Sequence, residues 1–215
     1  MEIVIPGTTN LSLFVVAAVA LLLVPGPAVL YIVARSIEQG RLAGFVSDLG
    51  IHSATLVHVL AAALGLSALL ASSALAFAAV KYAGAAYLIW IGLKKIFGRA
   101  EKGEVAALKP ASYSRLYRDG FIVNLLNPKT ALFFLAFLPQ FVDVGRGHVV
   151  SQIVVLGLIF TSLGFISDGC YALAASAAGK WLRQSRAYQS FERYVSGAIF
   201  IALGVSAAFA GNGKK

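Results

Sequence analysis

The sequence has little charge and almost no cysteine, and it lacks the long polar stretches of a soluble protein. Charged residues make up 13% of its 215 residues, too few for a soluble domain, whose surface needs more of them. Cys170 is the sole cysteine, so an intramolecular disulfide, a CxxC motif and thiol-relay chemistry are all excluded. We interpret Cys170 as a small buried hydrophobic side chain.

Sequence signatures of catalysis and of nucleic-acid binding are missing as well. Neither H-E-x-x-H nor G-x-S-x-G nor a comparable spacing of nucleophile and base occurs, so we expect neither an enzyme nor a cofactor. The net charge of +9 would suit a nucleic-acid partner, but the cations lie between apolar runs rather than on one basic face. Membrane topology explains these cations better.

Hydrophobic residues dominate what is present. They make up 59% of the chain, and the mean hydropathy is +0.83. A helix that crosses a membrane needs about 20 predominantly apolar residues. We therefore predict an all-α membrane protein, with one transmembrane domain over residues 1–215 in which six helices cross the bilayer. The six predicted spans lie near residues 10–34, 42–67, 74–97, 115–138, 150–178 and 190–210.

The lysines and arginines give these spans an orientation. Thirteen of the 18 lie in or beside the connections after spans 1, 3 and 5, including a basic linker at about residues 98–114. Because loops rich in Lys and Arg stay in the cytoplasm, these connections are predicted to be cytoplasmic and both termini periplasmic or extracellular. The basic linker would then contact anionic lipid head groups.

The two halves of the sequence resemble each other. Leu23–Leu30 matches Leu125–Leu132, and both segments carry a proline inside a predicted span. Two further correspondences are Lys81-Tyr82 and Gly92 with Arg193-Tyr194 and Gly204, and Thr55–His58 with Asp168–Tyr171. Three spans per repeat would invert the second copy, so we predict inverted repeats over about residues 10–97 and 115–210. Chance matching within a small apolar alphabet is the alternative.

Proline residues predict breaks in spans 1 and 4. Because proline removes a backbone hydrogen bond and clashes with the preceding turn, both helices should break there, the alternative being a simple kink. Broken helices at membrane depth must lie inside protein or beside a cavity. Freed carbonyls would accept from a substrate ammonium, and freed N–H groups would hold a carboxylate, so a zwitterion suits the site. The predicted substrate-binding residues are Pro25, Gly26, Pro27, Asn127, Pro128 and Lys129, with Lys129 facing the substrate carboxylate.

Ionisable side chains inside the predicted spans indicate function or internal pairing, because each is costly when it faces lipid alone. Helical spacing gives each of two spans one polar face. These faces comprise Asp48, His52, Thr55 and His58 in span 2, and Thr161, Asp168 and Tyr171 in span 5. Asp168 is the preferred proton carrier or ammonium ligand; pairing with Lys129 is the alternative, and the two roles are compatible.

The other ionisable residues of span 2 have alternatives of their own. Asp48 lies near the cytoplasmic end, and we favour the interpretation that it reaches toward the head groups or pairs with Arg41. Each histidine is either a proton relay or a core imidazole bonded to a backbone carbonyl. Asp48, His52 and His58 could also ligate a cation, so divalent-metal efflux is the alternative function. Against it, carboxylates are few and the loops lack histidine-rich tracts, so no metal site is predicted.

The motifs together resemble the LysE/RhtB family of amino-acid exporters. Asn127-Pro128-Lys129 followed by Pro139-Gln140-Phe141 is a specific pair, and the other matches run nearly end to end. They are Pro25-Gly26-Pro27, Gly50 with Leu56-Val57-His58, Ala83–Leu88 with Gly92, Phe133–Leu138, and Ser196-Gly197 with Leu203-Gly204. The resemblance implies a six-span exporter of amino acids or close derivatives, driven by the proton-motive force, in a bacterial inner membrane.

One departure from the family pattern concerns span 2. This chain has Ala54-Thr55 where the family usually has Gly-Asp before Leu-Val-His. A carboxylate that would bind a substrate amine or a proton is therefore missing at position 55, and neither substrate nor coupling carries over from the family. Small residues scattered along the spans would also allow two copies to pack as a homodimer.

Overall fold

The computed structural model describes residues 4–72 and 110–184, together with scattered helical positions between residues 79 and 97 and between 194 and 205. Within these residues the chain forms helices and short connections, and no strand occurs. The predicted spans near 74–97 and 190–210, most of the basic linker, and the repeat correspondence between those two spans lie outside the described residues.

The described helices differ greatly in length. In chain order they are α1 (Thr8–Leu22), α2 (Pro27–Gln39), α3 (Arg41–Ser72), α5 (Tyr113–Leu125), α6 (Pro128–Leu132), η1 (Phe133–Phe137), η2 (Leu138–Phe141), η3 (Val144–Arg146) and α7 (Val149–Gln184). The two longest, α3 and α7, contain no proline, so nothing in their backbones interrupts the hydrogen-bond ladder. η1 is a π-helical turn just before Pro139, where the helix loosens because proline offers no N–H.

Two of these helices are long and apolar enough to cross a membrane, over Arg41–Gly65 and Val149–Ala177. The pair α1 and α2 meets the same criteria when taken together, and so does α5 with Pro128–Phe141. The described residues therefore hold two candidate spans, or up to four if each bent pair is one span. The prediction of an all-α chain is confirmed for the described residues, and the arrangement of six helices as inverted repeats stays a prediction.

Both predicted helix breaks are present. α1 ends at Leu22 and α2 begins at Pro27, with a bend of 51° between them. α5 ends at Leu125 and α6 begins at Pro128, with a bend of 48°. Proline stands at the start of the second helix in each pair, where its missing N–H costs nothing and its fixed φ suits the helix. The prediction of breaks is confirmed, and the alternative of simple kinks is wrong.

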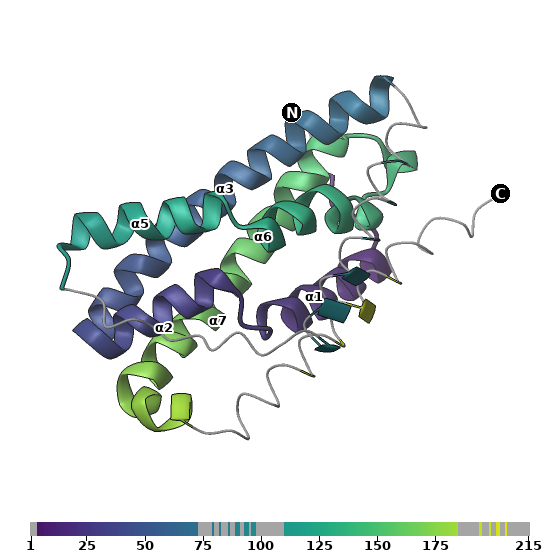
Figure 1. Ribbon diagram of the computed structural model, residues 1–215. Coiled ribbons are helices and arrows are strands. Elements are labelled where there is room, and N and C mark those ends of the chain that lie inside the picture. Colours follow the sequence, from purple (N-terminus) through teal and green to yellow (C-terminus); the bar gives the residue numbers. More distant parts are fainter. Residues whose placement is uncertain are drawn as a thin grey trace.

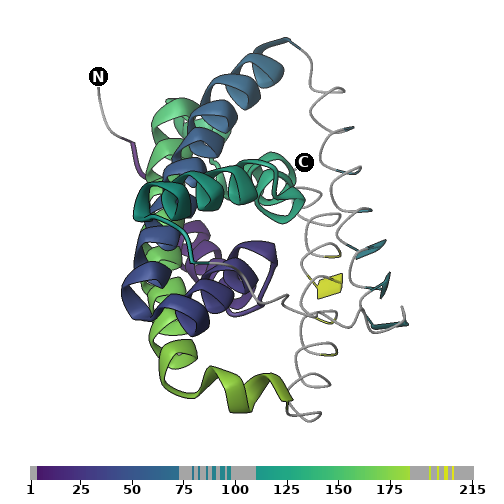
Figure 2. The same ribbon diagram turned by 60° about the vertical axis from the view of Figure 1, so that its left-hand side comes forward.

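The long helices α3 and α7 pack against each other, and the shorter helices lie against this pair. α5 runs along α3, α2 contacts both long helices, and α1 lies against α7 (Figures 1 and 2). A cluster of buried phenylalanines joins α1, η1 and α7 at one end of this arrangement. Phe133 of η1 stacks on Phe160 of α7 with ring centroids 4.2 Å apart, which fixes the segment after the second break onto α7.

Two glycines let α3 and α5 approach so closely that their backbones touch. A Cβ atom at Gly50 of α3 would overlap the carbonyl of Tyr117 in α5. A Cβ at Gly120 of α5 would lie 2.5 Å from the carbonyl oxygen of Ser47 in α3. Because the obstacle is backbone in both cases, no side-chain rotation could relieve the overlap. This contact holds the second broken helix against α3.

Candidate functional site

The carbonyl groups at the first break are held by side chains from distant helices. The Lys129 ammonium, on α6, donates hydrogen bonds to the carbonyl oxygens of Leu21 at 2.9 Å and Val24 at 2.5 Å. The hydroxyl of Tyr171, on α7, donates to the carbonyl of Leu23 at 2.9 Å. Carbonyls near the end of a helix lack intrahelical partners. Lys129 and Tyr171 therefore supply side-chain donors at the end of α1, where the Leu21 carbonyl also accepts from the backbone N–H of Val24 at 3.1 Å.

At the second break, an asparagine starts the new helix. The side-chain oxygen of Asn127 accepts a hydrogen bond from the backbone N–H of Lys129 at 3.1 Å, which is an N-cap. Its amide nitrogen donates to the side-chain oxygen of Asn124 at 3.3 Å, and the Thr130 hydroxyl donates to the same oxygen at 2.9 Å. The turn between α5 and α6 is thus closed by its own polar side chains.

Asn124 also ties this turn to α3. Its side-chain amide donates to the carbonyl of Ile51 at 2.8 Å and to the hydroxyl of Thr55 at 2.9 Å. His58 Nε2 lies 3.1 Å from the Asn124 backbone carbonyl, which can only accept, so this nitrogen carries the proton. Thr55 is therefore a hydrogen-bond partner of the second break.

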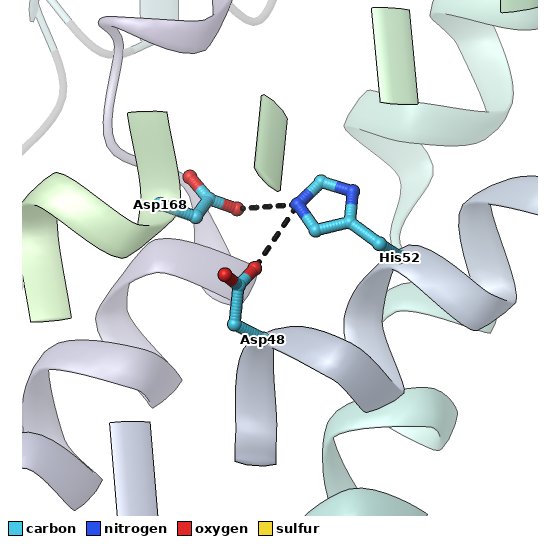
Figure 3. A group of neighbouring side chains, drawn as sticks. All are labelled: Asp48, His52 and Asp168. Carbon is cyan, nitrogen blue, oxygen red and sulfur yellow. Dashed lines mark ion pairs between the residues drawn. The ribbon is translucent and has the colours of Figure 1, made fainter. Parts of the chain in front are cut away.

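Two carboxylates and one imidazole meet where α3 crosses α7. Nε2 of His52 lies 3.1 Å from Asp48 Oδ1 and 3.4 Å from Asp168 Oδ2, so one ring nitrogen faces both carboxylates (Figure 3). The three residues are 7, 0 and 4% exposed respectively. These two contacts are ion pairs without the geometry of a hydrogen bond. Five buried side-chain atoms of the group therefore have no hydrogen-bond partner: both oxygens of Asp48, Oδ1 of Asp168 and both ring nitrogens of His52. We call these three residues the carboxylate–imidazole cluster.

The carboxylate–imidazole cluster has the donor atoms for a cation. Each residue offers one ligand atom, and the three atoms lie within 4.8 Å of one another. Neighbouring ligands of a tetrahedral ion at ~2.0 Å are about 3.3 Å apart, close to the separations seen here. A proton on the imidazole would satisfy the same two carboxylates by charge. The arrangement can therefore hold either a proton or a small cation.

Residues of both helix breaks line one cavity. Gly26 of the first break and Asn127 and Lys129 of the second all face it, and its volume is about 40 Å³. The wall continues through His52, Thr55, Asn124 and Asp168. The first turn of α2 contributes Ala28 and Val29, and Gly26, the N-cap of this helix, gives no capping side chain. A cavity of this size holds a few water molecules.

The structure brings five of the eleven residues predicted for the site to the wall of one cavity. Gly26, Thr55, Asn127, Lys129 and Asp168 line the cavity, whereas the remaining predicted residues do not. Those that stand outside its lining are Pro25, Pro27, Pro128, Asp48, His58 and Tyr171. The prolines shape the breaks, Asp48 supports the cluster, and Tyr171 and His58 bind the backbone at the breaks.

Two predictions about single residues are wrong. Asp48 neither reaches toward the head groups nor points at Arg41; it is fully buried beside His52, because α7 covers this face of α3. Cys170 is exposed rather than buried, because its neighbours Asp168 and Gly169 face α3 and the turn of the helix directs position 170 away from that contact.

The two histidines of α3 match different alternatives, one a core imidazole and the other an imidazole with acidic partners. His58 bonds the Asn124 carbonyl and stacks on Phe134 with ring planes 7° apart, as a core imidazole does. It is not part of the cation cluster, where Asp168 takes the place that the sequence suggested for His58. His52 instead faces two carboxylates with one ring nitrogen, and among the described residues it is the histidine with acidic partners.

Asn124 and Thr130 are site residues that the sequence analysis missed. Asn124 is 2% exposed and joins three helices through its side chain. The signal that could have found it is an asparagine inside an apolar span, one helical turn before the Asn127-Pro128 break. A polar side chain at that depth needs internal partners, and a broken helix supplies them.

Comparison with known proteins places this arrangement among transporters. The model of the LysE type translocator family matches residues 19–211. The uncharacterized membrane protein YrhP of Bacillus subtilis (strain 168) is 27% identical over 205 residues, which cover 91% of this chain and 97% of that protein. An uncharacterized membrane protein of Vibrio cholerae serotype O1 is 29% identical over 92% of this chain and 95% of its own length.

One group of relatives has a named activity. The leucine efflux protein of Salmonella typhimurium (strain LT2) is 29% identical over 166 residues, which cover 77% of this chain and 76% of that protein. The leucine efflux protein of Salmonella paratyphi A gives the same figures. No solved structure matches the chain significantly.

Proposed function

Because the chain belongs to the LysE type translocator family, we propose that it exports small amino acids or their derivatives across a bacterial inner membrane, driven by the proton-motive force. The observation that carries this proposal is the single cavity lined by both helix breaks and by a buried carboxylate, Asp168. Broken helices around a central site are a recurring way for transporters to bind charged substrates. The name of the leucine efflux relatives supports an amino acid as the substrate class.

The cavity offers complementary groups for a zwitterion. The carbonyls of Leu21 and Val24 at the first break accept hydrogen bonds, as their contacts with Lys129 demonstrate. The first turn of α2, at Ala28 and Val29, faces the same cavity and starts without a capping side chain. Its free N–H groups and the positive end of the helix dipole suit a carboxylate. An α-amino acid carries both of the groups that these two ends require.

Proton coupling is assigned to the carboxylate–imidazole cluster. Asp168 belongs both to the cluster and to the cavity wall, so it can exchange a proton for a substrate ammonium. Nε2 of His52 faces both Asp168, which lines the cavity, and Asp48, which does not, so a proton on this nitrogen is shared between the two carboxylates. Transport in which proton and substrate alternate at one carboxylate gives export against a gradient.

The proposed architecture has six membrane helices in two inverted repeats, with both termini periplasmic. Its support is that two bent helix pairs with similar bends, 51° and 48°, stand at matching places in the two halves of the sequence. Small residues at helix contacts also permit a homodimer. Cysteine accessibility at either terminus in intact cells would test the orientation.

Reconstitution into lipid vesicles tests the transport proposal. Vesicles containing the protein should accumulate labelled leucine or another small neutral amino acid by counterflow, and an imposed pH gradient should drive net movement. Asp168→Asn keeps the shape of the side chain but cannot ionise, so it should retain counterflow and lose the response to the gradient. No counterflow with any amino acid, or an unchanged response in the variant, would contradict the proposal.

Divalent-cation efflux is the second candidate, favoured by the three buried ligand atoms of the carboxylate–imidazole cluster. Oxygen and imidazole ligands suit zinc or manganese. A strain expressing the protein would then survive higher concentrations of one of these metals than a strain expressing His52→Gln. Equal sensitivity of the two strains would leave amino-acid export as the sole candidate.

A further inference from the structure

The ammonium of Lys129 lies where a substrate ammonium is expected. It bonds the carbonyl oxygens of Leu21, which lines the cavity, and of Val24, both at the first helix break. A primary alkylammonium is the same donor group as the α-ammonium of an amino acid. The site therefore already contains an ammonium group, supplied by the protein itself.

The surroundings of the Lys129 side chain are shaped to hold it in this position. Lys129 lies in the first turn of α6, two residues after the N-cap Asn127, and reaches across to the end of α1. On the way it passes Gly26, where a Cβ atom would lie 3.1 Å from Cδ and 3.6 Å from Nζ. Glycine at position 26 thus leaves the room that the lysine chain occupies.

We propose that Lys129 is a tethered occupant of the amine subsite, and that a zwitterion binds by exchange with it. The substrate ammonium takes over the carbonyls of Leu21 and Val24, and the released Lys129 ammonium pairs with the substrate carboxylate. This inference rests on the proposed export of amino acids. In this scheme the Lys129 ammonium has two positions. It bonds the two carbonyls when the site is empty, and it pairs with the substrate carboxylate when the site is occupied.

Exchange of this kind selects for ligands that carry both charges. A zwitterion adds no net charge to a cavity that contains Lys129, His52 and Asp168, and it provides a partner for each group that it displaces. An amine without a carboxylate adds one positive charge and gives the released lysine nothing in return. An acid without an amine pairs with the lysine but supplies no replacement donor for the Val24 carbonyl, and the Leu21 carbonyl keeps only the backbone N–H of Val24; losing such a partner is costly in a buried site.

Binding to purified protein in lipid nanodiscs tests the exchange. The probes are leucine, 3-methylbutylamine, which lacks the carboxylate, and 4-methylpentanoate, which lacks the amine. In the wild type the amine should bind much more weakly than leucine. In Lys129→Met, which keeps the length of the side chain and removes its charge, the ratio of the amine Kd to the leucine Kd should fall about tenfold, the value of one charge-assisted hydrogen bond.

Two further variants keep the test sharp. Tyr171→Phe removes a different donor from the same break, the one on Leu23, without removing an ammonium, so its Kd ratio should equal that of the wild type. Gly26→Ala crowds the Lys129 chain without changing its charge, so the ratio should shift in the same direction as in Lys129→Met, by a smaller factor. If Lys129→Met does not fold, the Kd ratio of Gly26→Ala still tests the exchange.

The outcomes separate the two levels of the proposal. If the wild type binds leucine but neither Lys129→Met nor Gly26→Ala changes the Kd ratio, Lys129 only caps the broken helix and the exchange is wrong. If Tyr171→Phe changes the Kd ratio as much as Lys129→Met does, then the ratio depends on the structure of the helix break and not on the Lys129 ammonium. This result would also overturn the exchange. If the wild type binds and transports no amino acid at all, the proposed function fails, and the exchange fails with it.

Discussion

A single methyl group at Gly164 should separate proton coupling from substrate movement. Gly164 lies on α7 against the imidazole of His52, and a Cβ atom there would lie 2.6 Å from Cε1 of the ring. Ordinary contacts begin at 3.4 Å, so the ring must withdraw by about 0.8 Å or α7 must move away from α3. Since Nε2 lies 3.1 and 3.4 Å from the two carboxylates, a shift of that size disrupts the cluster without altering any of its chemical groups.

The stability cost of Gly164→Ala should be that of overpacking a helix contact, about 1–3 kcal/mol. Gly157→Ala is a matched control on the same pair of helices. Its Cβ would lie 2.6 Å from two methyl carbons of Val59, so the overlap is equal but the neighbour is apolar. Both variants should therefore lose similar thermal stability in detergent, and only Gly164→Ala touches the cluster.

Vesicle transport distinguishes the two variants. Gly157→Ala should keep both counterflow and the response to a pH gradient, whereas Gly164→Ala should keep counterflow and lose most of the gradient response. A Gly164→Ala protein that follows the pH gradient as well as Gly157→Ala does would refute the reasoning that this cluster couples the proton. A loss of counterflow in both variants would instead assign the effect to the packing of α3 on α7.

Two further predictions concern the second broken helix. Gly50→Ala should prevent folding, since its Cβ would overlap the backbone carbonyl of Tyr117, and size-exclusion chromatography should then find no monodisperse protein. Gly65→Ala is the control on the same helix; a Cβ there would have no neighbour within 4 Å, so this variant should behave as the wild type. Asn124→Ala should lower the free energy of unfolding by about 3 kcal/mol or more, because partners on α3 and α6 lose buried hydrogen bonds. Unchanged melting temperatures in Asn124→Ala would contradict the role of this side chain in joining the helices.

The positions of the helix breaks could be predicted from the sequence because proline acts through its own backbone. Pro27 and Pro128 lack the N–H that a helix interior requires, whatever surrounds them, and both stand at the first position of a new helix. The uninterrupted helices α3 and α7 follow from the same local rule, since they contain no proline. The candidate binding residues at the breaks were found for this reason.

The partners of the polar side chains could not be predicted in the same way. Asp48 has a basic residue, Arg41, two turns earlier in its own helix, and sequence spacing alone favours a position near the head groups. Packing of α7 against α3 decided otherwise, because it covers this face and brings Asp168 to the far side of His52. Asn124 was missed because its hydrogen-bond partners lie mainly on another helix.

What the amino-acid sequence determined by itself is therefore the membrane class, the helices and the two places where they break. These features depend on local composition and on the backbone chemistry of single residues. Only the tertiary structure decided what the breaks contain. Lys129 and the Leu21 carbonyl are 108 residues apart in the chain, and they meet because two bent helices turn their breaks toward one cavity. Such a contact depends on the packing of whole helices, which no local pattern encodes.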